Sequence, residues 1–474
     1  MKNRVKLITS FLLGAILATA FTIFISPFRL RTIVAPANIG RIAAIEDVYH
    51  RLRDFHFFYD GDERALVNGA IEGMVNAIGD PNSTFFTMED FRDFSSNLGE
   101  SFYGIGAEVT TINGYTMIVS PFPGSPAEEA GLMANDVVIT IDDENVVGRP
   151  LGEVISMIQG PEGTQVTMGI RRAGQDDLVY ITPTRGRIPQ ESVRSELKIV
   201  DGIPIGYLRV LVFGEATARE FKEAITELEA SGIQGLIVDV RNNTGGYLRA
   251  VIEMLDYLLP EGEVITSVVD RNGRGETFTS SGETEGKTYP IITLINGGSA
   301  SASEIFAAAM KEAAGQEVVG MPSFGKGTVQ VSLPLDDMHM LKITNQIWRT
   351  SAGNWINEEG VQPTITVEEP DFYFYFQVFL GEAGEVGYDT VSPAVQSAQN
   401  ILNAVAGADI RSDGYFDQNT YLAVQDFQRD NNLEVTGTLN NETATALTMA
   451  LRDRIRDPQY DTQLQRALEV LISE

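Results

Sequence analysis

Three serines alternate with alanines directly after a glycine-rich break in the chain. Residues 291–295 are apolar and largely β-branched, which predicts a buried strand, and the break follows at residues 296–298. Ser299, Ser301 and Ser303 then open an alanine-rich stretch that predicts a helix. A helix start presents free backbone N–H groups beside a hydroxyl, a setting that stabilises developing negative charge. The pattern predicts a nucleophilic serine, with helix capping and close packing as the alternative.

A nucleophilic serine needs a base, and Lys326 is the candidate. The chain holds three histidines, and none stands in a recognisable Ser/His/Asp arrangement. Lys326 lies between two glycines, and Lys326, Thr328 and Gln330 are expected on one face of a strand, whose side chains repeat with period two. A lysine is a base only when neutral, and an apolar pocket would lower its pKa from about 10.4. Serine with lysine is a known hydrolase arrangement.

Three separated segments resemble one family, the carboxyl-terminal processing proteases. These segments, residues 238–246, 299–310 and 318–330, are similar to the motifs of these serine peptidases of family S41, also called tail-specific proteases. In that family the middle serine is the nucleophile, a lysine follows 25 residues later and a glutamine four beyond, as Ser301, Lys326 and Gln330 do here.

The resemblance also implies a fold and an oxyanion site. It implies a multidomain α/β protein with a crotonase/ClpP-like protease core over residues 188–370 and no metal or cofactor. The oxyanion donors would be the backbone N–H of Gly245 or Gly246 together with that of Ala302. Asp239 and Arg241, beside this loop, are expected to form a structural ion pair or to brace the loop.

Residues 99–187 resemble a PDZ domain. Short strands are predicted around a helical turn at 125–132 and an amphipathic helix at 151–158. By resemblance the segment Gly104, Ile105, Gly106 and Ala107 would bind a peptide carboxylate while the peptide adds a strand to the domain; the alternative is that its glycines only shape a hairpin. Many relatives carry an arginine, used to couple docking to activation, where this chain has Gln159.

The two ends of the chain suggest a location at the cell envelope. Residues 1–31 contain basic side chains followed by 22 uncharged residues at 7–28, which predicts a membrane anchor with the remainder exported; a cleaved signal peptide is the alternative. Residues 38–98 predict helices, which in the family contribute to a homodimer. Residues 391–451 resemble a three-helix peptidoglycan-binding domain, with a generic helical bundle as the alternative.

Composition excludes some classes of function. The formal net charge of −30 over 474 residues argues against binding nucleic acid, whose phosphates need basic side chains. The chain has no cysteine, so disulfides and thiolate metal sites are excluded. We expect an extracytoplasmic serine endopeptidase that recognises protein C-termini. The alternatives are a catalytically silent, wall-tethered PDZ scaffold and, on fold alone, a crotonase-like acyl-CoA enzyme.

Overall fold

The computed structural model describes residues 41–88, 90–91, 101–112, 114–172, 175, 177–189, 191–282, 286–380 and 384–473. The chain divides into two compact units, Met1–Phe86 with Ser332–Ile343 and Thr87–Val331 with Thr344–Glu474. The predicted anchor at 7–28 lies outside the described residues. Within the described ranges, no helix is both long and apolar enough to cross a membrane.

In the smaller unit, the described residues form two helices, a short strand and the adjoining ends of two longer strands. Its helices are α2 (Arg41–Phe55) and α3 (Glu63–Asn76), as the helical spacing predicted. The sequence did not predict strand β1 (Thr84–Thr87), whose Phe85 stacks on His339 with ring centroids 5.1 Å apart. No residue of α3 is buried, so this unit has little core of its own.

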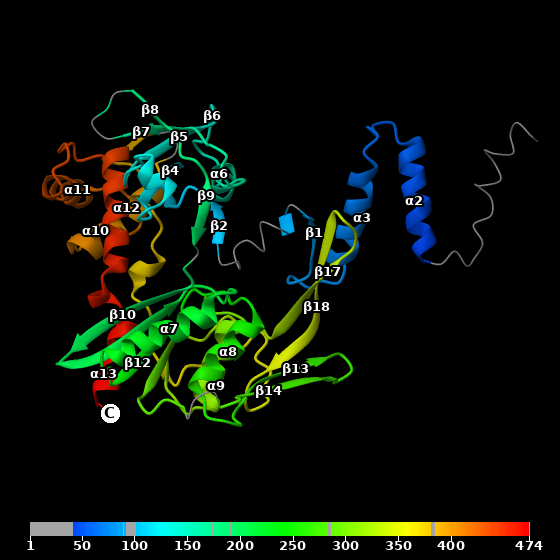
Figure 1. Cartoon of the computed structure of the whole chain (residues 1–474). Coiled ribbons are helices and arrows are strands. Elements are labelled where there is room, and N and C mark those ends of the chain that lie inside the picture. The colour runs from blue at the N-terminus through cyan, green and yellow to red at the C-terminus, as the bar shows by residue number, and fades with distance from the viewer. Residues whose placement is uncertain are drawn as a thin grey trace, which may run out of the picture. The chain divides into compact units, whose positions relative to one another are not determined.

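A six-stranded sheet forms the centre of the larger unit (Figure 1). Its strands, in spatial order, are β10 (Val193–Val200), β11 (Ile203–Val210), β12 (Gly235–Asp239), β15 (Ile291–Ile295), β16 (Val318–Gly320) and β19 (Ile365–Thr366). Only β10 runs antiparallel to its neighbour. The predicted α/β core is confirmed, and parallel strands of this kind need cover on both faces.

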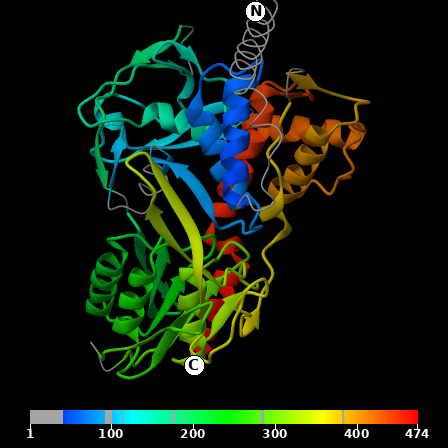
Figure 2. The ribbon, with the colours of Figure 1, turned by 90° about the vertical axis from the view of Figure 1, so that its right-hand side faces the viewer.

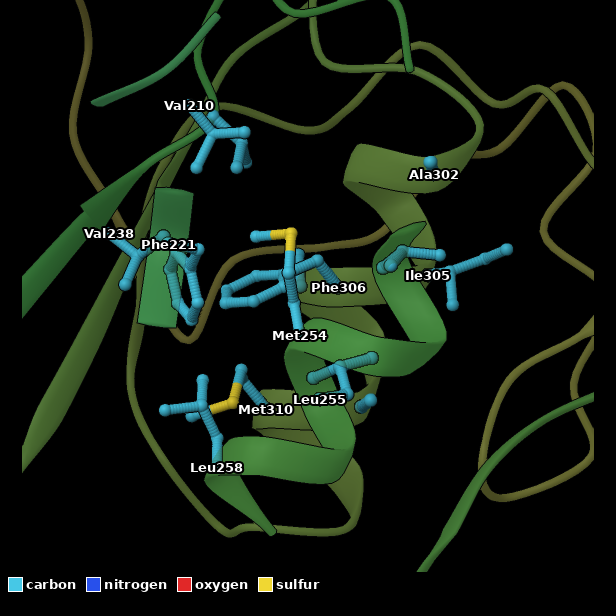
Figure 3. Packing of buried hydrophobic residues seen from close by; sticks show 14 of the residues in the cluster. Val210, Phe221, Val238, Met254, Leu255, Leu258, Ala302, Ile305, Phe306 and Met310 are labelled. Carbon is cyan, nitrogen blue, oxygen red and sulfur yellow. The ribbon is translucent and has the colours of Figure 1, made fainter. Parts of the chain in front are cut away.

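Three helices cover one face of this sheet. They are α7 (Thr217–Ala230), α8 (Leu248–Leu258) and α9 (Ala302–Glu312). Figure 3 shows Met254 of α8 and Phe306 of α9 packed near Phe221 of α7. Phe306 is fully buried, and its ring meets that of Phe221 edge-on at 6.1 Å. This packing fixes the start of α9, where the three serines lie.

The last helix, α13 (Thr462–Ser473), covers the other face. It lies beside the core strands (Figure 2). Alternate strand residues such as Ile237 and Leu294 pack against its apolar residues, which are Leu464, Ala467, Leu468 and Leu471. No domain is predicted beyond residue 451, and the structure shows that this helix belongs to the core of the larger unit.

A second β structure forms the PDZ domain. Its sheet contains β3 (Ala107–Ile112), β4 (Tyr115–Pro121), β5 (Val137–Ile141), β6 (Glu144–Asn145), β7 (Met168–Arg171) and β8 (Val179–Ile181), and β2 (Ser101–Gly104) pairs with β9 (Gly186–Pro189). The predicted helical turn and helix are α5 (Pro126–Glu129) and α6 (Leu151–Ile158). Apolar residues from α6 and the strands form a separate core.

The C-terminal bundle contains the three predicted helices. These are α10 (Pro393–Ala406), α11 (Gln418–Asp430) and α12 (Asn441–Arg456), with short strands β20 (Glu385–Val386) and β21 (Leu439–Asn440) and the turns η1 (Asp371–Phe374) and η3 (Pro458–Tyr460). Gln399 and Gln428 are fully buried and bind the turns that precede α11 and α12. In chain order, the bundle therefore lies between two elements of the central core, β19 before it and α13 after it.

The remaining strands pair with one another in a separate sheet. They are β13 (Val264–Asp270), β14 (Gly275–Thr279), β17 (Thr328–Pro334) and β18 (His339–Arg349). Strand β18 ends at Arg349, so residues 350–359 do not continue it. A turn and loop follow, because Gly353, at a φ of 85°, reverses the chain.

Leu471→Ala should destabilise the protease core although it lies near the C-terminus. The side chain is buried against the sheet, and leucine-to-alanine changes in such positions cost about 2–5 kcal/mol of unfolding free energy. Urea denaturation, compared with the exposed Leu422→Ala, measures this cost. An equal midpoint for both variants would mean that α13 is not part of the folded core.

Candidate active site

Ser301 occupies a strained turn at the start of α9. Its φ of 56° and ψ of −112° lie in a region that residues other than glycine rarely adopt, at a cost of about 1–3 kcal/mol. Ala302 is the first residue of α9, so its N–H has no partner within the helix. The turn thus presents the Ser301 side chain at a helix N-terminus, as the sequence predicted.

Hydrogen bonds distinguish the three serines. The Ser299 hydroxyl donates to the carbonyl of Val240 at 2.8 Å, and the Ser303 hydroxyl donates to the carbonyl of Asn243 at 2.7 Å. Both side chains are fully buried, whereas Ser301 is only half-buried. Ser299 and Ser303 therefore hold the turn in place, and Ser301 is the serine that a substrate can reach.

The carboxylate of Glu304 joins the nucleophile turn to the segment that carries Lys326. One oxygen, Oε2, accepts from the backbone N–H groups of Ser301 at 2.7 Å and Lys326 at 2.9 Å. The other, Oε1, accepts from the Ser323 hydroxyl and the Gly325 N–H, both at 2.6 Å. Glu304 is fully buried, so these four bonds replace its hydration. The backbones of Ser301 and Lys326 consequently lie side by side.

The chain's two tryptophans hold the opposite side of the same segment. The indole N–H of Trp348 donates to the carbonyl of Lys326 at 2.8 Å, and that of Trp355 donates to the carbonyl of Gly327 at 3.0 Å. A Cβ at Gly327 would lie 2.5 Å from the indole nitrogen of Trp355, so only glycine fits there. Backbone hydrogen bonds therefore position Lys326 from both sides.

Lys326 lies in a loop, which corrects the expectation that it shares a strand with Thr328 and Gln330. Strand β17 begins at Thr328, because the carbonyl and N–H groups before it bind Glu304, the tryptophans and Asn357. The amide nitrogen of Gln330 donates to the hydroxyls of Thr328 at 2.9 Å and Thr344 at 3.1 Å. These bonds fix the orientation of the Gln330 amide. Its predicted role in orienting Lys326 stays a prediction.

The loop after β12 lies directly against the nucleophile turn. A Cβ on Gly245 would be 2.9 Å from both the Ala302 nitrogen and the Ser301 Cβ, and one on Gly246 would be 2.2 Å from the carbonyl oxygen of Phe213. Both glycines also have positive φ angles, 102° and 149°. This close approach requires glycine at both positions.

Two asparagines tie that loop to the nucleophile turn. Asn243 accepts from the Ala300 N–H through its carbonyl, and its side-chain oxygen accepts from the Gly245 N–H at 2.9 Å. The side chain of Asn296 accepts from the Asn242 N–H at 2.9 Å. Since the Gly245 N–H is already used, Gly246 is the glycine better suited to bind an oxyanion with Ala302.

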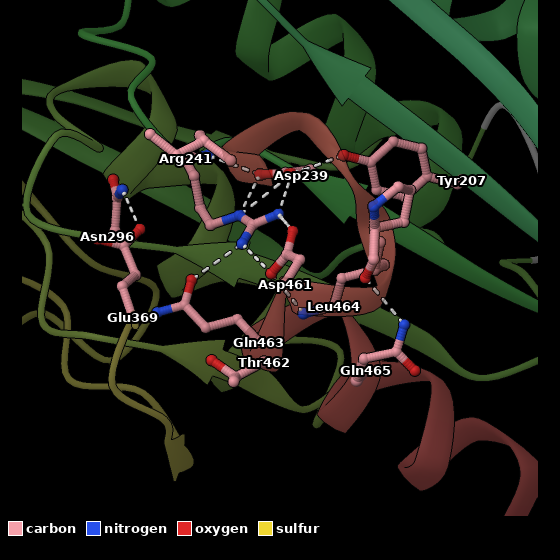
Figure 4. Close-up of polar contacts among 12 residues, drawn as sticks. Tyr207, Asp239, Arg241, Asn296, Glu369, Asp461, Thr462, Gln463, Leu464 and Gln465 are labelled. Carbon is pink, nitrogen blue, oxygen red and sulfur yellow. Dashed lines mark hydrogen bonds and ion pairs between the residues drawn. The ribbon is translucent and has the colours of Figure 1, made fainter. Parts of the chain in front are cut away.

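Asp239 and Arg241 form the predicted ion pair at the start of this loop (Figure 4). The Arg241 Nη2 donates to Asp239 at 2.7 Å, and the Tyr207 hydroxyl donates to the same carboxylate at 2.7 Å. Burial opposes ionisation of Asp239, but the charge of Arg241 and these hydrogen bonds outweigh it, so the pKa of Asp239 lies below its ordinary value. The pair stays charged at neutral pH.

The PDZ domain contains a groove at the predicted carboxylate-binding segment. A cavity of about 330 Å³ is lined by Phe102, Gly104, Ile105, Gly106, Ala107, Val109, Ile155, Ile158 and Gln159. Most of these side chains are apolar, and the lining comes from the segment before β3, from β3 itself and from α6. The structure thus brings the four predicted residues together beside Gln159.

Sequence reasoning missed Glu304, the two tryptophans and Asn243 as parts of the site. Glu304 could have been found from the sequence, because Ser301-x-x-Glu304 has the spacing of a capping box. In this motif the side chain of the third helical residue accepts a hydrogen bond from the backbone N–H of the residue that precedes the helix. The tryptophans act through indole bonds to carbonyls 22 and 28 residues away. No local sequence pattern predicts hydrogen bonds between residues so far apart in the chain.

Three family models match the chain. They are peptidase family S41 over residues 204–367, a PDZ domain over residues 117–172 and a putative peptidoglycan binding domain over residues 391–447. These matches fall within the three domains expected from the sequence.

Relatives match over most of the chain. It is similar to the carboxy-terminal processing protease CtpB of Bacillus subtilis, with 40% identity over 86% of this chain and 85% of that one. CtpA of the same organism is 34% identical, with both chains fully covered. Among solved structures, a photosystem II D1 C-terminal processing protease is 28% identical with a TM-score of 0.44, covering 69% of this chain and 86% of that one.

Glu304→Gln should impair both folding and catalysis. The substitution keeps the shape of the side chain but turns one acceptor oxygen into an N–H₂ group that faces two donors. An unsatisfied buried group costs about 1–3 kcal/mol, and misplacement of the reacting groups should lower kcat roughly tenfold or more. Thermal unfolding and peptidase assays measure the two effects. Glu253→Gln, which alters an exposed carboxylate of α8, is the control; equal behaviour of the two variants would contradict the role of Glu304.

Proposed function

Since the chain belongs to the carboxy-terminal processing proteases of peptidase family S41, we propose that it cleaves proteins outside the cytoplasm with Ser301 as nucleophile and Lys326 as base. Members of this family are serine peptidases, so a crotonase-like acyl-CoA enzyme, which rested on fold alone, is no longer favoured. The observation that carries the assignment of residues is the Glu304 carboxylate, whose Oε2 binds the backbones of Ser301 and Lys326 together.

In the proposed reaction the Ser301 Oγ attacks the carbonyl carbon of the scissile peptide bond. Neutral Lys326 takes the hydroxyl proton and later passes it to the leaving amine. The N–H groups of Gly246 and Ala302 stabilise the negative oxygen of the tetrahedral intermediate. The Gly245 N–H supports the loop through Asn243. Water then attacks the acyl-enzyme, with Lys326 again as base, and Ser301 is regenerated.

The PDZ groove gives the reaction its substrate class. Its apolar lining suits the side chain of an apolar C-terminal residue, and the segment Gly104 to Ala107 offers backbone N–H groups to the terminal carboxylate. An added peptide strand would extend along β3. We therefore propose that the domain delivers unstructured protein C-termini to Ser301. Because Gln159 lines the groove in place of an arginine, delivery does not require an arginine there.

Ser301→Ala and Lys326→Ala should each lower cleavage of an unstructured protein with an apolar C-terminus by a factor on the order of 10⁴ or more, because both groups act in one step. Ser299→Ala and Ser303→Ala should only weaken it, since those hydroxyls support the turn. Cleavage is followed by mass spectrometry with circular dichroism to check folding. Full activity in folded Ser301→Ala would overturn the assignment and favour the scaffold alternative.

The pH dependence tests the lysine separately. The neutral fraction of Lys326 increases with pH, so kcat/KM should rise with pH until the amine is fully deprotonated. Lys326→Arg is the control, because a guanidinium cannot serve as a base in this range. A flat profile from acid to alkaline pH, or an active arginine variant, would contradict the proposed base.

We further propose that the protein is a homodimer through its N-terminal helices. The apolar side chains of α2 and α3 are exposed in the single chain, for instance Ile42 at 82% and Met74 at 50%. Helices with such faces gain stability by burying them, and a second copy offers the same surface.

Val48→Glu, which places a charge on α2, should shift the protein from dimer to monomer because the charge would be buried in the interface. Sedimentation velocity measures the masses. Glu72→Gln, at an exposed polar position of α3, should leave the dimer intact. A wild-type protein that sediments as a monomer at micromolar concentration would refute the proposal.

The proposal of an envelope location rests on the two ends of the chain. We propose that residues 7–28 anchor the protein in the membrane and that the domain matched at residues 391–447 binds peptidoglycan. Two weak attachments on one chain raise its local concentration at the wall.

The intact protein is expected to fractionate with membranes, because 22 uncharged and mostly apolar residues can span a bilayer, and to keep its N-terminus. Without residues 1–31 it should still bind purified sacculi in a pull-down. Tyr415→Ala, which removes a half-buried aromatic ring of the wall-binding domain, should reduce that binding with cleavage unchanged. A mature protein that begins near Phe21 would instead establish a cleaved signal peptide.

A further inference from the structure

The first residues of α13 complete the surroundings of Arg241. The Arg241 Nη1 donates to Asp461 Oδ1 at 2.8 Å and to the Gln463 side-chain oxygen at 3.1 Å, and Nη2 donates to Asp461 Oδ2 at 2.7 Å (Figure 4). Together with Nε and Nη2 bonds to Asp239, all five guanidinium hydrogens have acceptors. Two carboxylates, 222 residues apart at 239 and 461, thus clamp one buried cation.

Because this cluster is buried, the charge of Arg241 depends on its bonds to Asp461. The side chain of Arg241 is 8% exposed and that of Asp461 is 15% exposed. Burial works against the charged guanidinium, and the attraction of Asp239 and Asp461 overcomes it, so the pKa of Arg241 stays well above its ordinary value. If Asp461 lost its charge, half of the guanidinium would face a neutral neighbour in a buried site, where an unpaired ion is strongly disfavoured.

Arg241 also opens the loop that carries the oxyanion glycines. Its backbone N–H donates to Asp239 at 2.9 Å, and the next residue, Asn242, holds a positive φ of 56°. That conformation is unfavourable for a side chain, so the loop depends on its neighbours to keep its shape. A shift of the Arg241 side chain would therefore be transmitted to Gly246 through only a few bonds.

The start of α13 is itself fixed to the core beside this loop. The Thr462 hydroxyl donates to the carbonyl of Glu368 at 2.9 Å, and the Gln463 amide donates to that of Val367 at 2.9 Å. The adjoining Glu369 carboxylate accepts from Asn296, the residue that holds the Asn242 N–H. Asp461 accepts from the Leu464 N–H at 3.0 Å, which orients its carboxylate. The acceptor for Arg241 is therefore rigidly placed.

We propose that Asp461 is a positioning residue for the peptidase reaction: through Arg241 it holds the oxyanion loop in the geometry that the N–H groups of Gly246 and Ala302 require. The inference rests on the proposed function of that loop. It gives the C-terminal helix, which lies after the wall-binding domain in the chain, a part in catalysis without contact to substrate.

The test is Asp461→Asn in the full-length protein. The amide keeps the size of the side chain and an oxygen for the Leu464 N–H but loses the charge that Arg241 needs. We expect kcat on a soluble unstructured substrate to fall roughly tenfold to a hundredfold, with KM nearly unchanged, because binding at the PDZ groove is untouched. Labelling of Ser301 by a fluorophosphonate, whose phosphoryl oxygen also needs the oxyanion site, should slow by a similar factor.

Two further variants separate positioning from general stability. Asp417→Asn makes the same change at the N-cap of α11, where the carboxylate likewise accepts a helix N–H, and should leave kcat at the wild-type value. In an Arg241→Gln background, Asp461→Asn should lower kcat by less than twofold, because the intermediary is already missing.

The outcomes are distinguishable from those for the proposed function. If wild-type protein cleaves and Ser301→Ala does not, but folded Asp461→Asn retains full kcat, this inference alone fails. The proposal would also be overturned if Asp461→Asn lowered kcat by the same factor in the Arg241→Gln background as in the wild-type protein. Should Asp461→Asn not fold, Asp461→Glu retains the charge while displacing the carboxylate by one methylene, and an unchanged kcat in that variant would likewise refute the proposal.

Discussion

The active-site region depends on one buried carboxylate. Glu304 accepts four hydrogen bonds, and three of them come from the backbone N–H groups of Ser301, Gly325 and Lys326. Each donor belongs either to the strained turn at Ser301 or to the loop that carries Lys326, so the two segments cannot separate without leaving a buried charge unsatisfied. This cost lets Ser301 keep an unfavourable φ of 56°. The two segments are thus held together through the backbone N–H groups of Ser301 and Lys326, without use of their side chains.

Elsewhere in the site, side chains likewise hold segments together by binding backbone groups. The indoles of Trp348 and Trp355 bind the carbonyls of the base loop, and Asn243 binds both the nucleophile turn and the Gly245 N–H. Glycines stand where two backbones come too close for a Cβ. Such a site needs a rigid support, and the closely packed helices α8 and α9 supply it. Rigid placement suits an oxyanion site, whose donors act best when they need no rearrangement during the reaction.

The domain order places the C-terminal helical bundle between two parts of the protease core. Strand β19 precedes the bundle as the edge strand of the central sheet, and α13 follows it and covers that sheet's second face. The bundle is therefore inserted between two core elements in the chain, although its sequence resembles that of a separate domain. Parallel strands are apolar on both sides, and without α13 residues such as Ile237 and Leu294 would be exposed to water.

The sequence by itself determined the local elements and the spacing of the reactive residues. A β-branched apolar run predicted β15, an amphipathic pattern predicted α6 and an alanine-rich stretch predicted α9, and the intervals between Ser301, Lys326 and Gln330 pointed to the family. It did not place Lys326 in a loop, because strand periodicity continues into residues whose backbone groups in fact bind Glu304. Nor did it assign α13 to the core or Asp461 to Arg241. Asp461 and Arg241 are 220 residues apart in the chain, and only the packing of α13 on the central sheet brings them together.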